Sequence, residues 1–409
     1  MRARLCRWLR TEPHELPALG WAFAYFLLLL CSYYILRPVR DAAAVEVGTQ
    51  ALQRLFTVTF VAMLALVPVF GWLCARLPRA RLLPVVNGFF ALNLVAFALF
   101  PEAKVFFVWL SVFNLFAVSV FWSLMSDLFD SAQAARLYGS IAAGGSCGAI
   151  AGPLLAVGFS GLGSSSLLLV AATLLAATIV CIVMLARWSR LHPRRGEAPQ
   201  EAPIGGSVLA GVRAALGSPF LLAICGYLLC YTALSTALYF QQVEIVREAV
   251  PDTAARTQLF ATLDLVVNAS TLVMQLLAFS RLTALLGPGW ILALMPLVSV
   301  AGFVWLGAVP TLAVLIAFGV TRRVGEFAIS KPARETLFTI VPREERYKAK
   351  NFIDTVIYRG GDALSGWIFA GLSVFFAAGV ALAWTSLAFF LGAKMRTWRH
   401  DNAKAGASV

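Results

Sequence analysis

Charged residues are scarce in this sequence, and long polar stretches are scarcer still. Asp, Glu, Lys and Arg make up only 13% of the 409 residues, whereas 60% are hydrophobic. A soluble domain carries about a quarter charged residues, and a soluble fold of this length could not cover its surface with so few. The charges gather between long apolar runs, as expected when lipid is the solvent. We therefore predict a multi-pass membrane protein.

Patterns typical of catalysis and metal binding are also missing from the sequence. There is no GxxxxGK[ST] phosphate loop, Ser-His-Asp set or metal-ligand spacing, so we expect no enzyme, catalytic residue, metal or cofactor. The seven cysteines show no paired spacing, which argues against a disulfide framework or a zinc site. The three histidines fall outside the predicted spans, which argues against a histidine relay inside the membrane.

The apolar runs predict an all-α fold of twelve transmembrane helices. The first run is too long for a cleavable signal and no small-x-small site follows it. A stretch rich in Arg, Pro, Gly and Glu divides the chain into an N-terminal six-helix bundle (1–187), a cytoplasmic linker (188–217) and a C-terminal six-helix bundle (218–409). At about 20 residues per span, the predicted spans are 17–38, 55–75, 82–100, 105–127, 136–158, 164–186, 218–240, 256–279, 288–307, 309–330, 348–371 and 374–393.

The orientation follows from where the 33 Lys and Arg residues lie. Most of them fall on the side of the N-terminus, and basic loops stay in the cytoplasm. We expect both termini to be cytoplasmic and the protein to lie in the inner membrane of a bacterium. The net charge of +13 then needs no nucleic-acid partner. The basic loop 331–350 could bind anionic lipid head groups, but the positive-inside rule is the favoured explanation. We expect a monomer surrounded by membrane lipids.

Two local patterns favour the major facilitator fold. Segments 135–152 and 349–366 can be aligned about half a chain apart, and two parallel six-span repeats are typical of that fold. The loop GWLCARLPRAR (71–81) resembles the loop motif of major facilitator transporters but lacks its Asp, and span five carries glycines at the spacing of an antiporter motif. Close helix packing explains such glycines as well. The candidate gating or packing residues are Gly71, Arg76, Arg79, Arg81, Gly148, Gly152, Pro153, Gly360 and Gly361.

Ionisable residues concentrate on the spans that would line a central cavity. Spans three, six, nine and twelve contain no Asp, Glu, Lys or Arg, and an ionisable residue inside a bilayer is a functional candidate by default. The candidate substrate-binding residues are Arg37, Arg40, Asp41, Arg322, Arg323, Glu326, Tyr358 and Arg359. The candidates for proton coupling or ion pairing are Asp264, Asp354 and Asp362.

Spacing suggests partners for some of these charges. Arg322 and Glu326 are four residues apart, and Arg359 and Asp362 three, so each pair can meet on one helix face. Asp264 has no partner nearby in the sequence, so we expect either a proton carrier or a salt bridge to an Arg of span ten or eleven. Because the acids and arginines balance, the set suits a structural network as well as a binding site. The guanidinium groups would suit an anionic substrate.

Three segments resemble the ATP/ADP translocases, the nucleotide transporters of plastids and intracellular bacteria: 32–41 (SYYILRPVRD), 121–152 and above all 331–367. The resemblance implies a major-facilitator-like fold and exchange of nucleotides. Arg40 and Asp41 stand where that family has a basic-acidic pair, and Lys348 and Lys350 match basic positions. Around Leu110, where the resemblance leads us to expect an acid, the chain is apolar. The resemblance therefore implies a transporter more directly than it implies a nucleotide.

The leading interpretation is a secondary transporter that moves an anionic small molecule, such as a nucleotide or another phosphorylated compound, by rocking two halves about a central site. Two alternatives stay open. One is a proton-coupled exporter of amphipathic compounds or lipids, which the span-five glycines and Asp264 favour. The other is a membrane scaffold or sensor that does not transport.

Overall fold

The computed structural model is helical throughout, without a strand, over the residues that it describes. The predicted all-α fold is confirmed. Of the predicted linker 188–217, residues 193–216 lie outside the described part of the chain. The described residues are 11–76, 79–192, 217–277, 279–338, 341, 353–369 and 373–407.

Six long helices correspond to the first six predicted spans. The first ends at Gly48, whose φ of 86° is a left-handed conformation that glycine adopts without a steric penalty and that commonly ends helices. A short 3-10 turn, η1 (Ser160–Leu162), joins the last two. The helices are α2 (Leu16–Val47), α3 (Thr49–Arg76), α4 (Arg79–Leu99), α5 (Ala103–Leu128), α6 (Ser131–Phe159) and α7 (Ser164–Leu191).

The second half contains four more long helices: α9 (Pro219–Ala249), α10 (Thr253–Leu277), α11 (Phe279–Ala308) and α16 (Val374–Ala407). The other two predicted spans are interrupted by π-helices. Span 309–330 is α12 (Leu312–Gly325) followed by η2 (Glu326–Ser330), and the chain continues as α13 (Lys331–Leu337). Within 348–371, the described residues form η4 (Ile353–Ile357) and α15 (Tyr358–Phe369). Ten described helices are long and apolar enough to cross a membrane, and these two segments are absent from that set because each α-helical piece is short.

The outer faces of the helices are apolar, as expected in lipid. On α4, for example, the large side chains Val85, Phe89 and Leu92 are all exposed. In water such a face would oppose folding, but lipid tails are as apolar as these side chains, so nothing drives their burial. The predicted multi-pass membrane protein is therefore consistent with the exposed surface as well as with the helix lengths.

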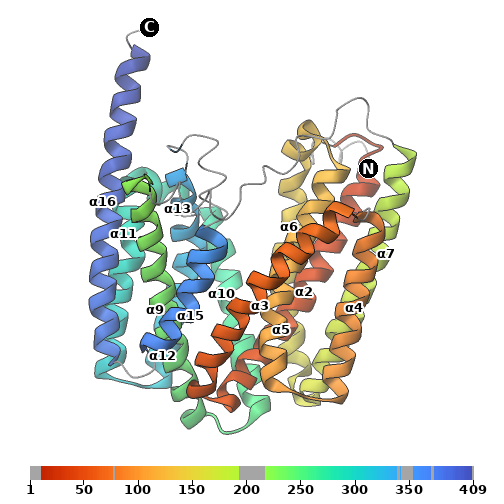
Figure 1. Ribbon diagram of the computed structural model, residues 1–409, viewed down its shortest axis with the longest axis horizontal. Coiled ribbons are helices and arrows are strands. Elements are labelled where there is room, and N and C mark those ends of the chain that lie inside the picture. The colour runs from red at the N-terminus through yellow and green to blue at the C-terminus, as the bar shows by residue number, and fades with distance from the viewer. Residues whose placement is uncertain are drawn as a thin grey trace. The chain divides into compact units, whose positions relative to one another are not determined.

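The chain forms two compact units, whose helices can be followed in Figure 1. Unit 1 comprises 1–47, 61–198 and 250–268. In it α2 packs chiefly against α6 and α7, and α4 packs against α7. Phe26 of α2 stacks on Phe121 of α5 with 4.2 Å between ring centroids. The first part of α10 belongs to this unit, which the predicted division at 187 and 218 did not anticipate.

Unit 2 comprises 48–60, 199–249 and 269–409. Here α11 packs against α16, and α9 packs against both α15 and α16. The first part of α3 belongs to this unit, because Trp367 of α15 donates a hydrogen bond of 2.9 Å to the Thr57 hydroxyl and the Phe56 ring lies 6.0 Å from that of Phe240. The N-terminal part of α3 therefore belongs to unit 2, and the N-terminal part of α10 belongs to unit 1. In both cases the rest of that unit comes mainly from the other half of the sequence.

Glycines let α2 and α6 approach closely, and Figure 1 shows the two helices side by side. A Cβ atom on Gly148 would collide with the Leu27 carbonyl oxygen and lie 2.9 Å from the Cys31 nitrogen. A Cβ atom on Gly152 would lie 2.7 Å from the Cys31 carbonyl oxygen. Two of the glycines predicted in the antiporter-like motif therefore lie directly in this helix contact.

We expect Gly148→Ala to destabilise the protein by about 1–3 kcal/mol, because the added methyl group overpacks the contact between the helices. The measurement is thermal unfolding of purified protein in detergent. Gly139→Ala is the matched control on the same helix, because a Cβ there meets nothing within 4 Å. Equal unfolding temperatures for the two variants would contradict the assigned close contact.

Candidate functional site

The C-terminal part of α2 carries a network of charges in unit 1. Arg37 Nε lies 3.6 Å from Asp264 Oδ2 of α10 and 4.0 Å from Asp41 Oδ2. Arg40 donates to Asp41 Oδ1 from Nε at 3.0 Å and from Nη2 at 2.7 Å, and its guanidinium carbon lies 5.4 Å from the ring centroid of Phe107. Both carboxylates are buried. The two positive and two negative formal charges cancel.

Asp264 has a partner that its sequence context did not suggest. The sequence predicts a proton carrier or a salt bridge to span ten or eleven, whereas Asp264 forms an ion pair with Arg37 of α2. One turn further along α10, Asn268 donates a 2.7 Å hydrogen bond to the Ala149 carbonyl of α6. The first part of α10 is thus attached to α2 and α6 by polar contacts, and breaking a buried ion pair leaves each charge uncompensated.

Arg322 of α12 is a buried cation in unit 2 with only neutral contacts among the described side chains. Its side chain is 5% exposed. Nη2 donates to the Ser235 hydroxyl at 2.8 Å and to the Tyr231 carbonyl at 3.3 Å, both on α9. Its Nε–H has no hydrogen-bond partner, and no described carboxylate comes within ion-pair distance. Glu326 interacts with Arg322 electrostatically but not within ion-pair distance, and a buried guanidinium without a direct ion pair is unfavourable.

Glu326 pairs with Arg334, and the Arg322–Glu326 pair that their spacing predicted is not formed. Glu326 Oε1 lies 3.5 Å from Arg334 Nη1, and both side chains are buried. The contact with Arg334 follows from the π-helix η2, which begins at Glu326 and so changes the register of the residues after it, not that of Arg322. In a regular α-helix, the side chain eight residues after Glu326 would point about 80° away from it, after two full turns. A π-helix turns less per residue, so Arg334 returns to the face of Glu326, and its side chain leans toward the N-terminus to meet it.

The start of α15 adds a second group of polar side chains to unit 2. Arg359 Nη1 lies 3.9 Å from Asp362 Oδ2, as their spacing predicts. The Arg359 guanidinium carbon lies 5.6 Å from the ring centroid of Tyr358, and that ring lies 6.0 Å from Tyr231 of α9. Because Arg322 also lies over Tyr231, at 5.4 Å, the two tyrosine rings link α12 to α15 through α9. We take this group as the candidate binding site.

The remaining predicted residues are distributed more widely. Arg323 is half-buried beside Arg322, and a Cβ on Gly361 would collide with the Thr232 hydroxyl of α9. Gly360 faces the Phe60 ring at 3.5 Å from the position of a Cβ. Pro153 is buried inside α6. Lys348 and Lys350 lie outside the described residues. For Gly71, Arg76, Arg79, Arg81 and Asp354 the helical backbone is described but the side chains are not.

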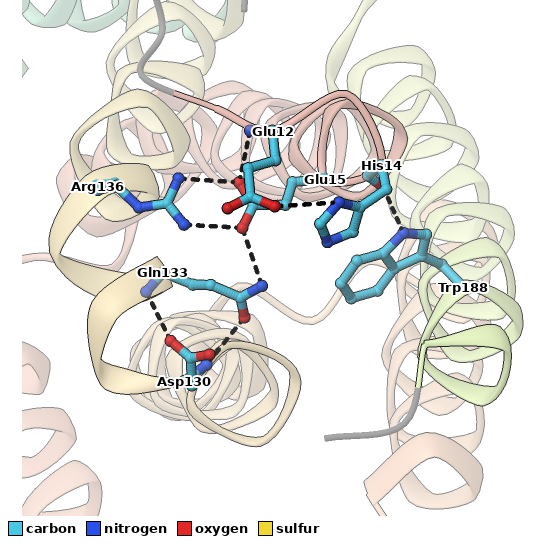
Figure 2. Close-up of polar contacts among 7 residues, drawn as sticks. All are labelled: Glu12, His14, Glu15, Asp130, Gln133, Arg136 and Trp188. Carbon is cyan, nitrogen blue, oxygen red and sulfur yellow. Dashed lines mark hydrogen bonds and ion pairs between the residues drawn. The ribbon is translucent and has the colours of Figure 1, made fainter. Parts of the chain in front are cut away.

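A polar cluster that the sequence analysis missed lies where α2 and α6 begin (Figure 2). Glu15, 1% exposed, accepts hydrogen bonds from Arg136 Nη2 at 2.9 Å and Nη1 at 3.1 Å, and from Gln133 Nε2 at 3.0 Å. Gln133 also closes a capping box with Asp130 at the first turn of α6. The Asp-x-x-Gln spacing just before span five is the signal that could have revealed it.

The same cluster contacts the end of α7. Trp188 Nε1 donates to the His14 carbonyl at 2.9 Å, as Figure 2 shows. Glu12, His14 and Glu15 offer ligand atoms within 4.8 Å of one another. Both Glu15 oxygens, however, already accept hydrogen bonds from Arg136, and a cation there would compete with the guanidinium. The arrangement is that of an ion-paired anchor for three helix ends rather than of a metal site.

Comparisons with known proteins agree on one class. The family model described as Major Facilitator Superfamily matches residues 20–361. No curated protein sequence matches the chain. Among solved structures, a bacterial homologue of the iron transporter ferroportin in an inward-facing state is similar at 13% identity and TM-score 0.66, over 93% of this chain and 98% of that one. A variant of the nucleoside transporter NupG is similar at 15% identity and TM-score 0.60, over 94% and 99%. At these identities the structures show a shared fold alone.

Glu15 should contribute to stability in a pH-dependent way. Burial by itself would raise the pKa of Glu15, but hydrogen bonds from Arg136, the Glu12 backbone N–H and Gln133, together with the charge of Arg136, hold it below its usual 4.5. A pKa lowered by folding means that the ionised group stabilises the folded state above about pH 4.5, and that this contribution is lost as the pH falls through the folded value.

We therefore expect Glu15→Gln to lower the unfolding temperature near neutral pH, by an amount equivalent to about 1.5–3 kcal/mol. The gap from the wild type should narrow as the pH falls below about 4.5. Thermal unfolding across a pH series measures it, with the exposed Glu102→Gln as the control for charge removal. A gap of constant size at all pH values would contradict the assigned ion pair.

The Arg37–Asp264 contact can be tested by a double-mutant cycle. Arg37→Gln and Asp264→Asn should each lower stability by about 3 kcal/mol, because each leaves the opposite charge buried. The double variant should lose about 1–3 kcal/mol less than the sum of the two single losses. Unfolding temperatures of the four proteins give the coupling, and strict additivity would show that the two groups do not interact.

Proposed function

This chain belongs to the major facilitator superfamily, and we propose that it is a secondary active transporter that moves an anionic small molecule across the inner membrane of a bacterium. The family and its structural neighbours are membrane transporters. Transport in this fold works by alternating access, in which two bundles move about a site between the membrane faces. From the distribution of Lys and Arg we further propose that both termini are cytoplasmic.

The observation that carries the choice of an anion is the surplus charge of Arg322. In unit 1 the charges of Arg37 and Arg40 are offset by Asp41 and Asp264 at 4.0 Å or less. In unit 2 the hydrogen bonds of Arg322 go to neutral oxygens, and its Nε–H has no hydrogen-bond partner among the residues that the structure describes. A guanidinium binds carboxylate or phosphate through two parallel hydrogen bonds. Among the described side chains of this set, Arg322 is thus the buried arginine that lacks an ion pair with a carboxylate, which supports its availability to a ligand.

Phosphorylated compounds, including nucleotides, are our preferred subclass. The resemblance of segments 32–41, 121–152 and 331–367 to ATP/ADP translocases favours them. The Tyr231 and Tyr358 rings close to Arg322 also favour them, because aromatic rings can pack against a flat base. The apolar surroundings of Leu110 depart from what that resemblance implies. Sugar phosphates and carboxylates therefore stay within the proposed class.

The test is a thermal-shift screen of purified protein against nucleotides, sugar phosphates, carboxylates and lipophilic cations. A ligand that binds only the folded state raises its apparent stability. We expect a phosphorylated or carboxylated compound to stabilise the wild type. We expect Arg322→Ala to weaken its affinity by about 10–100-fold, the equivalent of a lost charge-assisted hydrogen bond. Arg190→Ala removes the same charge from the exposed end of α7 and should leave the shift unchanged.

Two outcomes would decide against the proposal. Stabilisation by lipophilic cations alone, unaffected by Arg322→Ala, would favour an exporter of amphipathic compounds. No stabilisation by any compound, with no uptake of labelled anions into proteoliposomes, would favour a non-transporting scaffold or sensor. Without ligand, Arg322→Ala should be at least as stable as the wild type, because removing an uncompensated buried charge relieves its desolvation cost. That result would separate a binding role from a structural one.

A further inference from the structure

The π-helix η2 contains a carbonyl group that its own backbone ladder does not serve. At the end of η2 the Lys331 N–H donates to the Glu326 carbonyl, five residues back. The next bond of the same ladder would run from residue 332 to the Phe327 carbonyl, but residue 332 is proline, which has no N–H. A backbone carbonyl without a donor is costly inside a membrane, so Phe327 needs a partner from elsewhere.

Gln275 of α10 supplies that partner. Its Nε2 donates a hydrogen bond of 3.1 Å to the Phe327 carbonyl, and both residues belong to unit 2. In a regular α-helix the Phe327 carbonyl would accept from the Lys331 N–H, four residues on, and would need no side chain. The hydrogen bond from Gln275 therefore stabilises the π register of this turn over the α register.

Pro332 acts in the same direction. In a regular α-helix the ring of a proline clashes with the carbonyl of the residue four positions before it, which here is Ala328. The wider π turn moves that carbonyl away from the ring. The α register is thus disfavoured by the proline, and the π register is supported by the glutamine of a neighbouring helix.

The register of this turn decides which cation Glu326 meets. In the π register Glu326 lies 3.5 Å from Arg334. In the α register Arg334 would point about 80° away, and the buried carboxylate would need another cation. Arg322 lies four residues before Glu326, a spacing that allows an ion pair on one helix face, and its Nε–H has no hydrogen-bond partner among the described residues. Glu326 would then take the position that we assign to the anion.

We propose that Gln275 is a positioning residue for the anion site: by holding η2 in the π register, it keeps Glu326 on Arg334 and leaves Arg322 open to the ligand. This role rests on the anion binding proposed for Arg322 and adds the residue that prevents the chain from blocking its own site. Without the hydrogen bond from Gln275, part of the population has Arg322 neutralised by Glu326. The apparent affinity for the ligand falls by the fraction that remains competent.

The experiment measures the affinity for sulfate by thermal-shift titration of the purified full-length chain at one pH. Gln275→Met keeps the length of the side chain and removes the donor. It should weaken sulfate binding by about 2–10-fold, the range of one neutral hydrogen bond. Gln258→Met changes an exposed glutamine of the same helix and should keep the wild-type affinity. Wild-type affinity in Gln275→Met would overturn the proposal.

Two further variants separate positioning from a general loss of structure. In a Glu326→Gln background, Gln275→Met should leave sulfate affinity unchanged, because the competing carboxylate is gone. Pro332→Ala supplies an N–H and removes the clash, so it should favour the α register and weaken sulfate binding without lowering the unfolding temperature. An equal effect of Gln275→Met in both backgrounds would contradict the proposal, and so would a wild-type affinity in Pro332→Ala.

A measurement without ligand covers the case in which sulfate does not bind. Glu326→Gln and Arg334→Gln should together lower the unfolding temperature by less than the sum of their separate effects, because the two side chains are in contact. In a Gln275→Met background the two effects should add. Unchanged coupling in that background would overturn the role of Gln275. Loss of the coupling, with no effect of sulfate on the wild type, would show that the anion site at Arg322 has failed while Gln275 still sets the register of η2.

Discussion

A charged side chain inside the membrane cannot be hydrated, so a protein charge or a ligand must neutralise it. The polar interior of this protein follows that constraint in detail. In unit 1 an ion-pair network joins Arg37, Arg40, Asp41 and Asp264, and in unit 2 Glu326 lies against Arg334. Where the constraint is met within the protein, the contact holds helices together. At Arg322, which has no ion pair among the described side chains, we propose that a ligand supplies the opposite charge.

The second constraint is that every backbone group in the membrane must find a hydrogen bond, which makes irregular helices informative. The two π-helices, η2 and η4, lie in the two spans that carry most of the predicted site residues. A π turn shifts the face on which all later side chains lie, and such turns are frequent at functional sites. In span ten this shift affects the residues after Glu326 and brings Arg334 to it.

Most of the fold could be predicted from the sequence because lipid imposes simple rules on length and apolarity. The helices lie where about 20 apolar residues occur in a row, and the ion pair between Arg359 and Asp362 follows from helical spacing. Contacts between distant segments could not be predicted. Nothing in the sequence places Asp264 beside Arg37, and the polar cluster around Glu15 joins three helix ends that are far apart in the chain. The π turn at Glu326 was equally invisible, since its residues, EFAIS, would fit an ordinary helix.

Because α3 and α10 are each divided between the two units, the polar contacts at their N-terminal parts attach one helix to both units. The first part of α10 is attached to unit 1 by Asp264 and Asn268, while the rest of the helix belongs to unit 2. The first part of α3 is attached to unit 2 through Thr57, and the rest belongs to unit 1. A helix that belongs to two units must bend or release one attachment when the units move. The two attachments differ in strength, because the Thr57 hydrogen bond is between neutral groups whereas Asp264 belongs to a buried ion pair. Separating a buried ion pair costs more than breaking a neutral hydrogen bond, so under the proposed alternating-access mechanism we expect the contact of α3 to break before that of α10.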